Sequence, residues 1–167
     1  VLPEAVREVQ AYALPNPAPK KIAIFAALHY WIEQAGLIAL ALAGQGHEVE
    51  LAYLPYAEWD KPISRFDLRR QDLYTQKVFA PASPILKLTP LVERLQPDAK
   101  LPEELEQIVQ HVSDYDTQYT LQVEETDPSA PLYQLRMARN RQAAGALYTW
   151  LQAERPDVFI VPNGTIL

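Results

Sequence analysis

The chain has 167 residues, of which 49% are hydrophobic and 22% are charged, and its formal net charge is −6. This composition is typical of a globular domain with one core, and the longest apolar stretch, at residues 35–43, contains a glycine and is too short to span a membrane. The chain has no cysteine and three histidines, which excludes a disulfide scaffold and a cysteine-ligated zinc site. Because this composition fits a reducing compartment, we expect a cytoplasmic location.

The first part of the chain predicts a β-α-β unit after a lead-in at residues 1–19. A continuous apolar run is typical of a strand buried on both faces, and a segment that is apolar nearly all round is typical of a helix packed on a sheet. Gly44 follows this helix and ends it. The expected elements are a helix over 4–12, a strand over 22–28, a helix over 31–43 and a strand over 47–54. A right-handed crossover makes the two strands parallel.

The second part of the chain is divided by prolines, nine of which lie between Pro55 and Pro131, both included. We expect residues 56–130 to form a mostly helical insertion after the second strand. The expected elements are short helices over 66–78, 85–95 and 102–112, a long helix over 132–154 and a last strand over 158–161. The predicted fold class is α/β, with a Rossmann-like open parallel sheet.

The negative charge is concentrated in one segment of this insertion. Residues 98–127 contain nine acidic side chains and one lysine, whereas the rest of the chain contains 12 acidic and 14 basic side chains. We interpret the acidic segment as solvated. Asp114 and Asp116 lie inside it, and we expect them to be solvated rather than to hold a cation, so no metal or other resident cofactor is predicted. Because the chain is acidic and lacks a basic stripe with interleaved aromatic residues, nucleic-acid binding is disfavoured.

The residue after the first strand is the strongest catalytic candidate. Open parallel sheets bind ligands beyond the carboxyl ends of their strands, which is where His29 lies. An imidazole titrates near neutral pH and can act as a general base, and Glu33, one helical turn on, is the candidate for orienting it. The alternative is a histidine that only caps the helix.

Four further residues at this edge are candidates for binding a substrate. Tyr30 and Trp31 offer aromatic faces for stacking on a sugar or a base, although Trp31 also suits the core. Asn163 and Gly164 follow the last strand and combine an amide with a backbone that a ligand can approach closely. The alternative for this pair is a plain tight turn.

Two groups of arginines suit the recognition of phosphate or carboxylate groups. The groups are Arg65, Arg69 and Arg70, and Arg136, Arg139 and Arg141. We retain Arg139 as a candidate substrate-binding residue, whereas the common alternative for such groups is a solvated helix face.

Several common catalytic motifs are missing from the sequence. Residues 28–31 contain no glycine, so neither the dinucleotide-binding fingerprint nor a P-loop can form after the first strand. The sequence also contains no G-x-S-x-G and no H-E-x-x-H.

Two parts of the sequence resemble a known family. Residues 21–25 (KIAIF), the helix expected after them and residues 46–51 (GHEVEL) together resemble the start of the two-domain GT-B glycosyltransferases. Residues 155–164 (RPDVFIVPNG) are similar to a segment of the bacterial capsule-polysaccharide type. The resemblance covers about a third of the chain, and it departs from the family in lacking the glycine pair after the first strand.

The resemblance implies the N-terminal, acceptor-binding domain of an enzyme that transfers a sugar from a nucleotide-sugar donor to a cell-surface polysaccharide precursor. His29 matches the position of a catalytic base, and the donor binds mainly to a second domain beyond Leu167, so the isolated domain is expected to be inactive. Two alternatives stay open. One is a non-enzymatic ligand-sensing or interaction module, which could be a homodimer, and the other is a flavodoxin-like nucleotide-binding domain.

Overall fold

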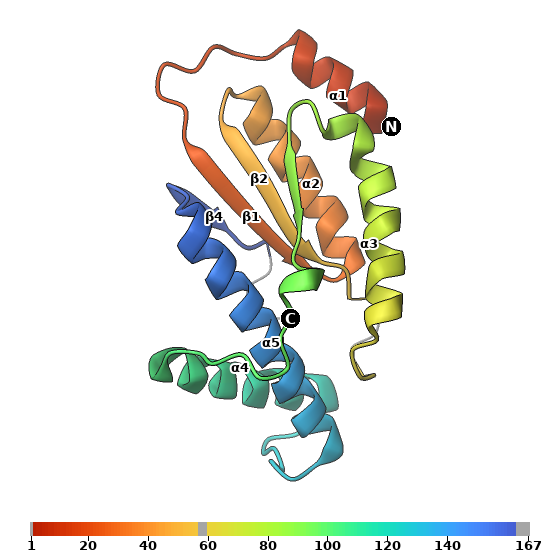
Figure 1. The fold of residues 1–167 in the computed structure, drawn as a ribbon, viewed down its shortest axis with the longest axis vertical. Helices are drawn as coiled ribbons and strands as arrows, with labels where there is room; N and C mark the ends of the chain where they lie inside the picture. Colours follow the sequence, from red (N-terminus) through yellow and green to blue (C-terminus); the bar gives the residue numbers. More distant parts are fainter. Residues whose placement is uncertain (1, 57–59, 163–167) are drawn as a thin grey trace.

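The structure is a computed structural model that describes residues 2–56 and 60–162, apart from the side chain of His29. Its centre is a parallel sheet with the strand order β3-β2-β1-β4 (Figure 1). The strands are β1 (Lys21–Ala27), β2 (Glu48–Leu54), β3 (Lys87–Pro90) and β4 (Val158–Ile160). The helices are α1 (Leu2–Ala11), α2 (His29–Gly44), α3 (Arg65–Phe79), α4 (Glu103–Leu121) and α5 (Pro131–Glu154). This architecture confirms the predicted α/β class and Rossmann-like sheet.

The two middle strands, β1 and β2, are buried on both faces and, apart from Glu50 of β2, their buried residues are hydrophobic. Six of the seven residues in each strand are buried, and the register pairs Ile22 with Val49 and Ala27 with Leu54. Such continuous apolar runs are typical of parallel strands covered by helices on both sides. The burial therefore explains why these strands could be predicted from sequence.

Helices cover both faces of the sheet and form two cores. On one face, α1 and α2 pack on the strands together with Phe79 from the end of α3. Gly36 of α2 permits this packing, because a Cβ atom at that position would overlap the Phe79 ring. On the other face, Ala146 and Trp150 of α5 share a second core with Phe25 of β1.

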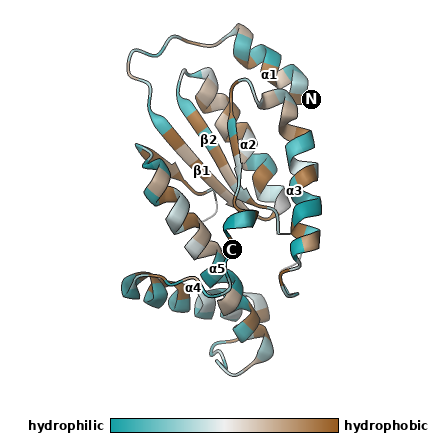
Figure 2. Cartoon of the chain, in the orientation of Figure 1, coloured by the Kyte–Doolittle hydropathy of each residue, from teal (hydrophilic) through white to brown (hydrophobic). Residues whose placement is uncertain are grey.

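The outer helices differ in polarity and position. Figure 2 shows more hydrophilic colour on α3 and α4 than on α2. In Figure 1, α4 and the amino-terminal half of α5 extend past the carboxyl ends of the strands. Among the described residues, none of the helices combines the length and the apolar character needed to cross a membrane.

One predicted element, the helix over 85–95, is wrong. Residues 87–90 form β3, and a single 3-10 turn follows at Val92–Arg94. The apolar residues of this segment recur at a spacing that also suits a helix. Pairing with β2, which sets Lys87 opposite Glu50, decides the outcome, because sheet pairing depends on a distant segment rather than on local spacing. The segment predicted as an insertion therefore contributes a strand to the sheet.

A buried carboxylate joins the second core to the edge of the sheet. Glu50 of β2 is only 3% exposed. Its side chain accepts hydrogen bonds from Trp150 Nε1 at 3.0 Å, from the Thr89 hydroxyl at 2.5 Å and from Lys87 Nζ at 2.9 Å. These donors come from α5 and β3, so one acidic side chain connects three elements. Buried charges are tolerated when they are paired and fully hydrogen-bonded in this way.

We expect Glu50→Ala to lower the free energy of unfolding by about 3 kcal/mol, because the buried indole N–H of Trp150 and the half-buried hydroxyl of Thr89 lose their acceptor. Glu154→Ala is the matched control, since Glu154 also binds Lys87, at 3.2 Å, but its side chain is 22% exposed. The control should cost less than about 1 kcal/mol. Urea unfolding followed by tryptophan fluorescence measures both values, and equal losses would contradict this account of Glu50.

Candidate functional site

The strand order places a topological switch point between β1 and β4. From β1 the chain moves outward to β2 and β3, and it then returns to β4 on the other side of β1. The connections on the two sides of β1 also pack on opposite faces of the sheet. In open parallel sheets, ligands bind in the crevice at the carboxyl ends of such strands. The ends of β1 and β4 therefore mark the candidate site.

The turn after β1 has a strained backbone. Leu28 has a φ of 70°, in a region that favours glycine, and it is nevertheless buried. Its N–H donates to the Leu54 carbonyl at 3.1 Å, and its carbonyl accepts from the N–H groups of Trp31 and Ile32, both at 3.2 Å. These bonds lead the chain directly from β1 into α2. A glycine would relieve the strain, but this leucine also fills the core.

The predicted residues on α2 fall into two environments. His29 is the first residue of α2, and its side chain lies outside the described part of the structure. Tyr30 is 50% exposed and Trp31 packs against both cores, with 5.5 Å between the centroids of their rings. The buried Nε1 of Trp31 has no hydrogen-bond partner among the described residues. Glu33 is exposed.

The residues predicted after β4, Asn163 and Gly164, lie outside the described residues. The pairing of His29 with Glu33 also stays a prediction. At this edge the structure brings together Tyr30 and Trp31.

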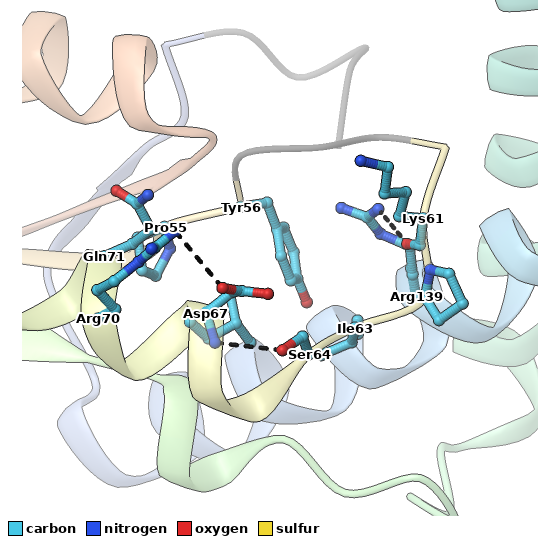
Figure 3. Close-up of a pocket in the computed structure, with 11 residues that line it drawn as sticks. Pro55, Tyr56, Lys61, Ile63, Ser64, Asp67, Arg70, Gln71 and Arg139 are labelled. Carbon is cyan, nitrogen blue, oxygen red and sulfur yellow. Dashed lines mark hydrogen bonds and ion pairs between the residues drawn. The ribbon is translucent and has the colours of Figure 1, made fainter.

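A pocket of about 290 Å³ lies beside this edge, at the carboxyl end of β2 (Figure 3). It is built from the residues that follow β2, from the amino-terminal part of α3 and from α5. The lining residues are Pro55, Tyr56, Lys61, Pro62, Ile63, Ser64, Asp67, Leu68, Arg70, Gln71 and Arg139. Arg139, predicted to bind substrate, therefore lines a pocket together with Arg70 of the first arginine group. The other lining residues are not predicted as site residues from the sequence.

Tyr56 is the most unusual residue in the pocket. It is 3% exposed, and its hydroxyl group has no hydrogen-bond partner among the described residues. Figure 3 shows the hydroxyl pointing into the space between Asp67 and Ile63. Burial raises the pKa of the Tyr56 hydroxyl, so it stays protonated at neutral pH. Tyr56 can therefore donate a hydrogen bond to a ligand.

Arg139 is fixed against Tyr56. Its guanidinium carbon lies 4.7 Å from the centre of the Tyr56 ring, and Nη1 donates a hydrogen bond to the Lys61 carbonyl at 3.0 Å. Arg139 is 5% exposed, and burial lowers the pKa of its guanidinium. Arginine nevertheless stays charged at physiological pH. The pocket therefore contains a buried positive charge held in one orientation.

The start of α3 forms the opposite wall. Ser64 caps the helix, and its Oγ accepts a hydrogen bond from the Asp67 N–H at 3.2 Å. Asp67 is the one acidic side chain among the described lining residues, and it forms an exposed ion pair with Arg70 at 3.5 Å. The sequence contains a signal for this wall, namely Ser64 followed three residues later by Asp67. A serine with an acid at this spacing is typical of a helix start.

The expectation that Asp116 is solvated is wrong. In the second arginine group, Arg136 and Arg139 are buried, whereas Arg141 is exposed. Asp116 and Arg136 are 2% and 3% exposed and form an ion pair between α4 and α5. Beside them, the Asn140 amide donates to the Ser113 hydroxyl at 3.0 Å. Some polar residues of the acidic segment therefore form part of the interface between α4 and α5.

We expect Asp116→Ala to cost about 3 to 5 kcal/mol of unfolding free energy, because it removes the carboxylate that neutralises the buried Arg136. Glu106→Ala is the matched control, since Glu106 joins the same two helices through the partly exposed Arg141 at 2.6 Å. The control should cost less than about 1 kcal/mol. Guanidinium unfolding distinguishes the two, and a small loss for Asp116→Ala would contradict the proposed importance of the pair.

Comparison of this chain with protein-family models, with curated proteins and with solved structures found no match in any of the three.

Proposed function

We propose that this chain is the acceptor-binding N-terminal domain of a glycosyltransferase that uses a nucleotide-sugar donor and acts on a cell-surface polysaccharide precursor. The observation that supports the proposal is the switch point between β1 and β4. It sets the strand that leads to His29 beside the parallel strand that leads to Asn163, with Ile24 opposite Ile160. In sheets of this type, ligands bind at such a place.

In this proposal, His29 removes the proton from the acceptor hydroxyl as it attacks the donor sugar. Glu33 orients the imidazole, and Tyr30 and Trp31 stack on the acceptor. The exposed ring of Tyr30 beside the partly buried ring of Trp31 supports this role, because sugars bind through their apolar faces to accessible aromatic rings. Asn163 and Gly164 bind the acceptor as well, and a second domain supplies the donor site.

A second candidate is a small-molecule-sensing module. The observation that favours it is the pocket beside β2, whose walls all come from this chain. Such a module would bind its ligand without a second domain and would not turn over a nucleotide sugar.

We expect His29→Ala, made in the complete enzyme, to lower turnover at least tenfold, the loss of about 1.4 kcal/mol of transition-state stabilisation or more that follows removal of a general base. Release of nucleotide from a nucleotide-sugar donor measures turnover. His111→Ala is the matched control, because His111 is exposed on α4 and should not affect the reaction. A loss below tenfold for His29→Ala would argue against the base.

The 167-residue chain alone provides a second control for the same proposal. It should release no nucleotide, since the donor site lies mainly in the second domain. Transfer by this chain alone would refute the two-domain proposal.

A further inference from the structure

We propose that the pocket beside β2 binds the oxyanion group of a small hydroxylated molecule, through Tyr56, Arg139, Lys61 and the amino end of α3. The inference goes beyond the glycosyltransferase proposal and does not depend on it. The oxyanion is a phosphate or a carboxylate, and the two are separated by the experiment below.

The first argument is the hydroxyl group of Tyr56. A buried polar group without a partner destabilises a protein, so such groups in native structures call for an explanation. Tyr56 lines the pocket, and its buried hydroxyl lies among the lining residues Asp67 and Ile63 (Figure 3). A ligand oxygen that accepts its hydrogen bond would satisfy it.

The second argument is the charge of the pocket. Among the described lining residues, Lys61, Arg70 and Arg139 are basic and Asp67, which pairs with Arg70, is the one acid. Asp60 and Asp116, which are not lining residues, also act on the charge of Arg139. Arg139 is buried and held over the Tyr56 ring, so its charge is screened less by solvent than that of an exposed arginine. Tyr56 and Arg139 thus present a neutral donor and a cation side by side, an arrangement that suits an oxyanion.

The third argument is the direction of α3. This 15-residue helix begins at the pocket, so its first-turn N–H groups and its dipole favour a negative charge there. Ser64 takes up only one of these N–H groups, that of Asp67. The helix start and the orphan Tyr56 hydroxyl are independent observations that point to the same kind of ligand.

Asp67 and the size of the pocket narrow the ligand class. The Asp67 carboxylate accepts hydrogen bonds and repels a second anionic group, so it favours a ligand that also carries hydroxyl groups. A volume of about 290 Å³ corresponds to roughly ten water molecules. This suits a molecule the size of one sugar ring bearing a single anionic group, and it is small for a nucleotide sugar.

The test is a titration of the 167-residue protein with inorganic phosphate and, separately, with acetate, at constant ionic strength set by chloride. We expect saturable changes in the NMR signals of the first-turn amides of α3 and of the Arg139 side chain. Saturation by phosphate alone identifies a phosphate site, and saturation by both anions identifies a general oxyanion site. Saturation by neither would overturn the proposal.

Two matched variants test the role of Tyr56. Tyr56→Phe should weaken binding about five- to tenfold while leaving the urea midpoint of the free protein unchanged or higher, because it removes an unpaired hydroxyl. Tyr53→Phe makes the same change three residues earlier, within β2, where the hydroxyl donates to Asp72 at 2.6 Å. This control should lower the urea midpoint and leave binding unchanged. Unchanged binding in Tyr56→Phe would overturn the proposal. Since no nucleotide sugar is used, that result would leave the glycosyltransferase proposal intact.

Discussion

The carboxylate of Glu50 determines how the rest of the structure is arranged. By accepting from Trp150, Thr89 and Lys87, it fixes α5 on the sheet and β3 along its edge. Trp150 lies three helical turns after Arg139, and both face inward on α5 together with Ala143 and Ala146. The contact near the amino ends of the strands therefore sets the rotation of the helix that carries Arg139 to the opposite end of the sheet.

A second group of buried charges lies between α4 and α5. The Asp116–Arg136 pair lies one turn before Arg139, in the part of α5 that extends beyond the sheet (Figure 1). Burying two charges is expensive, so a pair of this kind is better understood as specifying one arrangement than as adding stability. A purely apolar interface would allow α5 to rotate or slide, whereas the pair fixes the height and rotation at which Arg139 meets Tyr56.

The sequence predicts the elements that depend on local pattern and misses those that depend on distant partners. The apolar runs of β1 and β2 and the spacing of apolar residues in α5 predict these elements correctly, and Arg139 is predicted as a member of an arginine group. β3 was missed because its pairing with β2 is non-local. Tyr56 was missed because an unpaired hydroxyl exists only once the surrounding chain has folded. The burial of Asp116 cannot be predicted from the sequence, because a local excess of acidic residues does not indicate that one of them is buried.

The turn at Leu28 connects the core to the chemistry proposed at the edge. A φ of 70° in a non-glycine residue costs about 1 to 3 kcal/mol, which is comparable to what burying a leucine side chain contributes. Hydrophobic packing of the Leu28 side chain thus stabilises the unfavourable positive φ of its backbone. The packing of Leu28 in the core consequently determines the direction in which the backbone leaves the sheet at His29. Substitutions in that core would therefore change the backbone at the edge of the sheet.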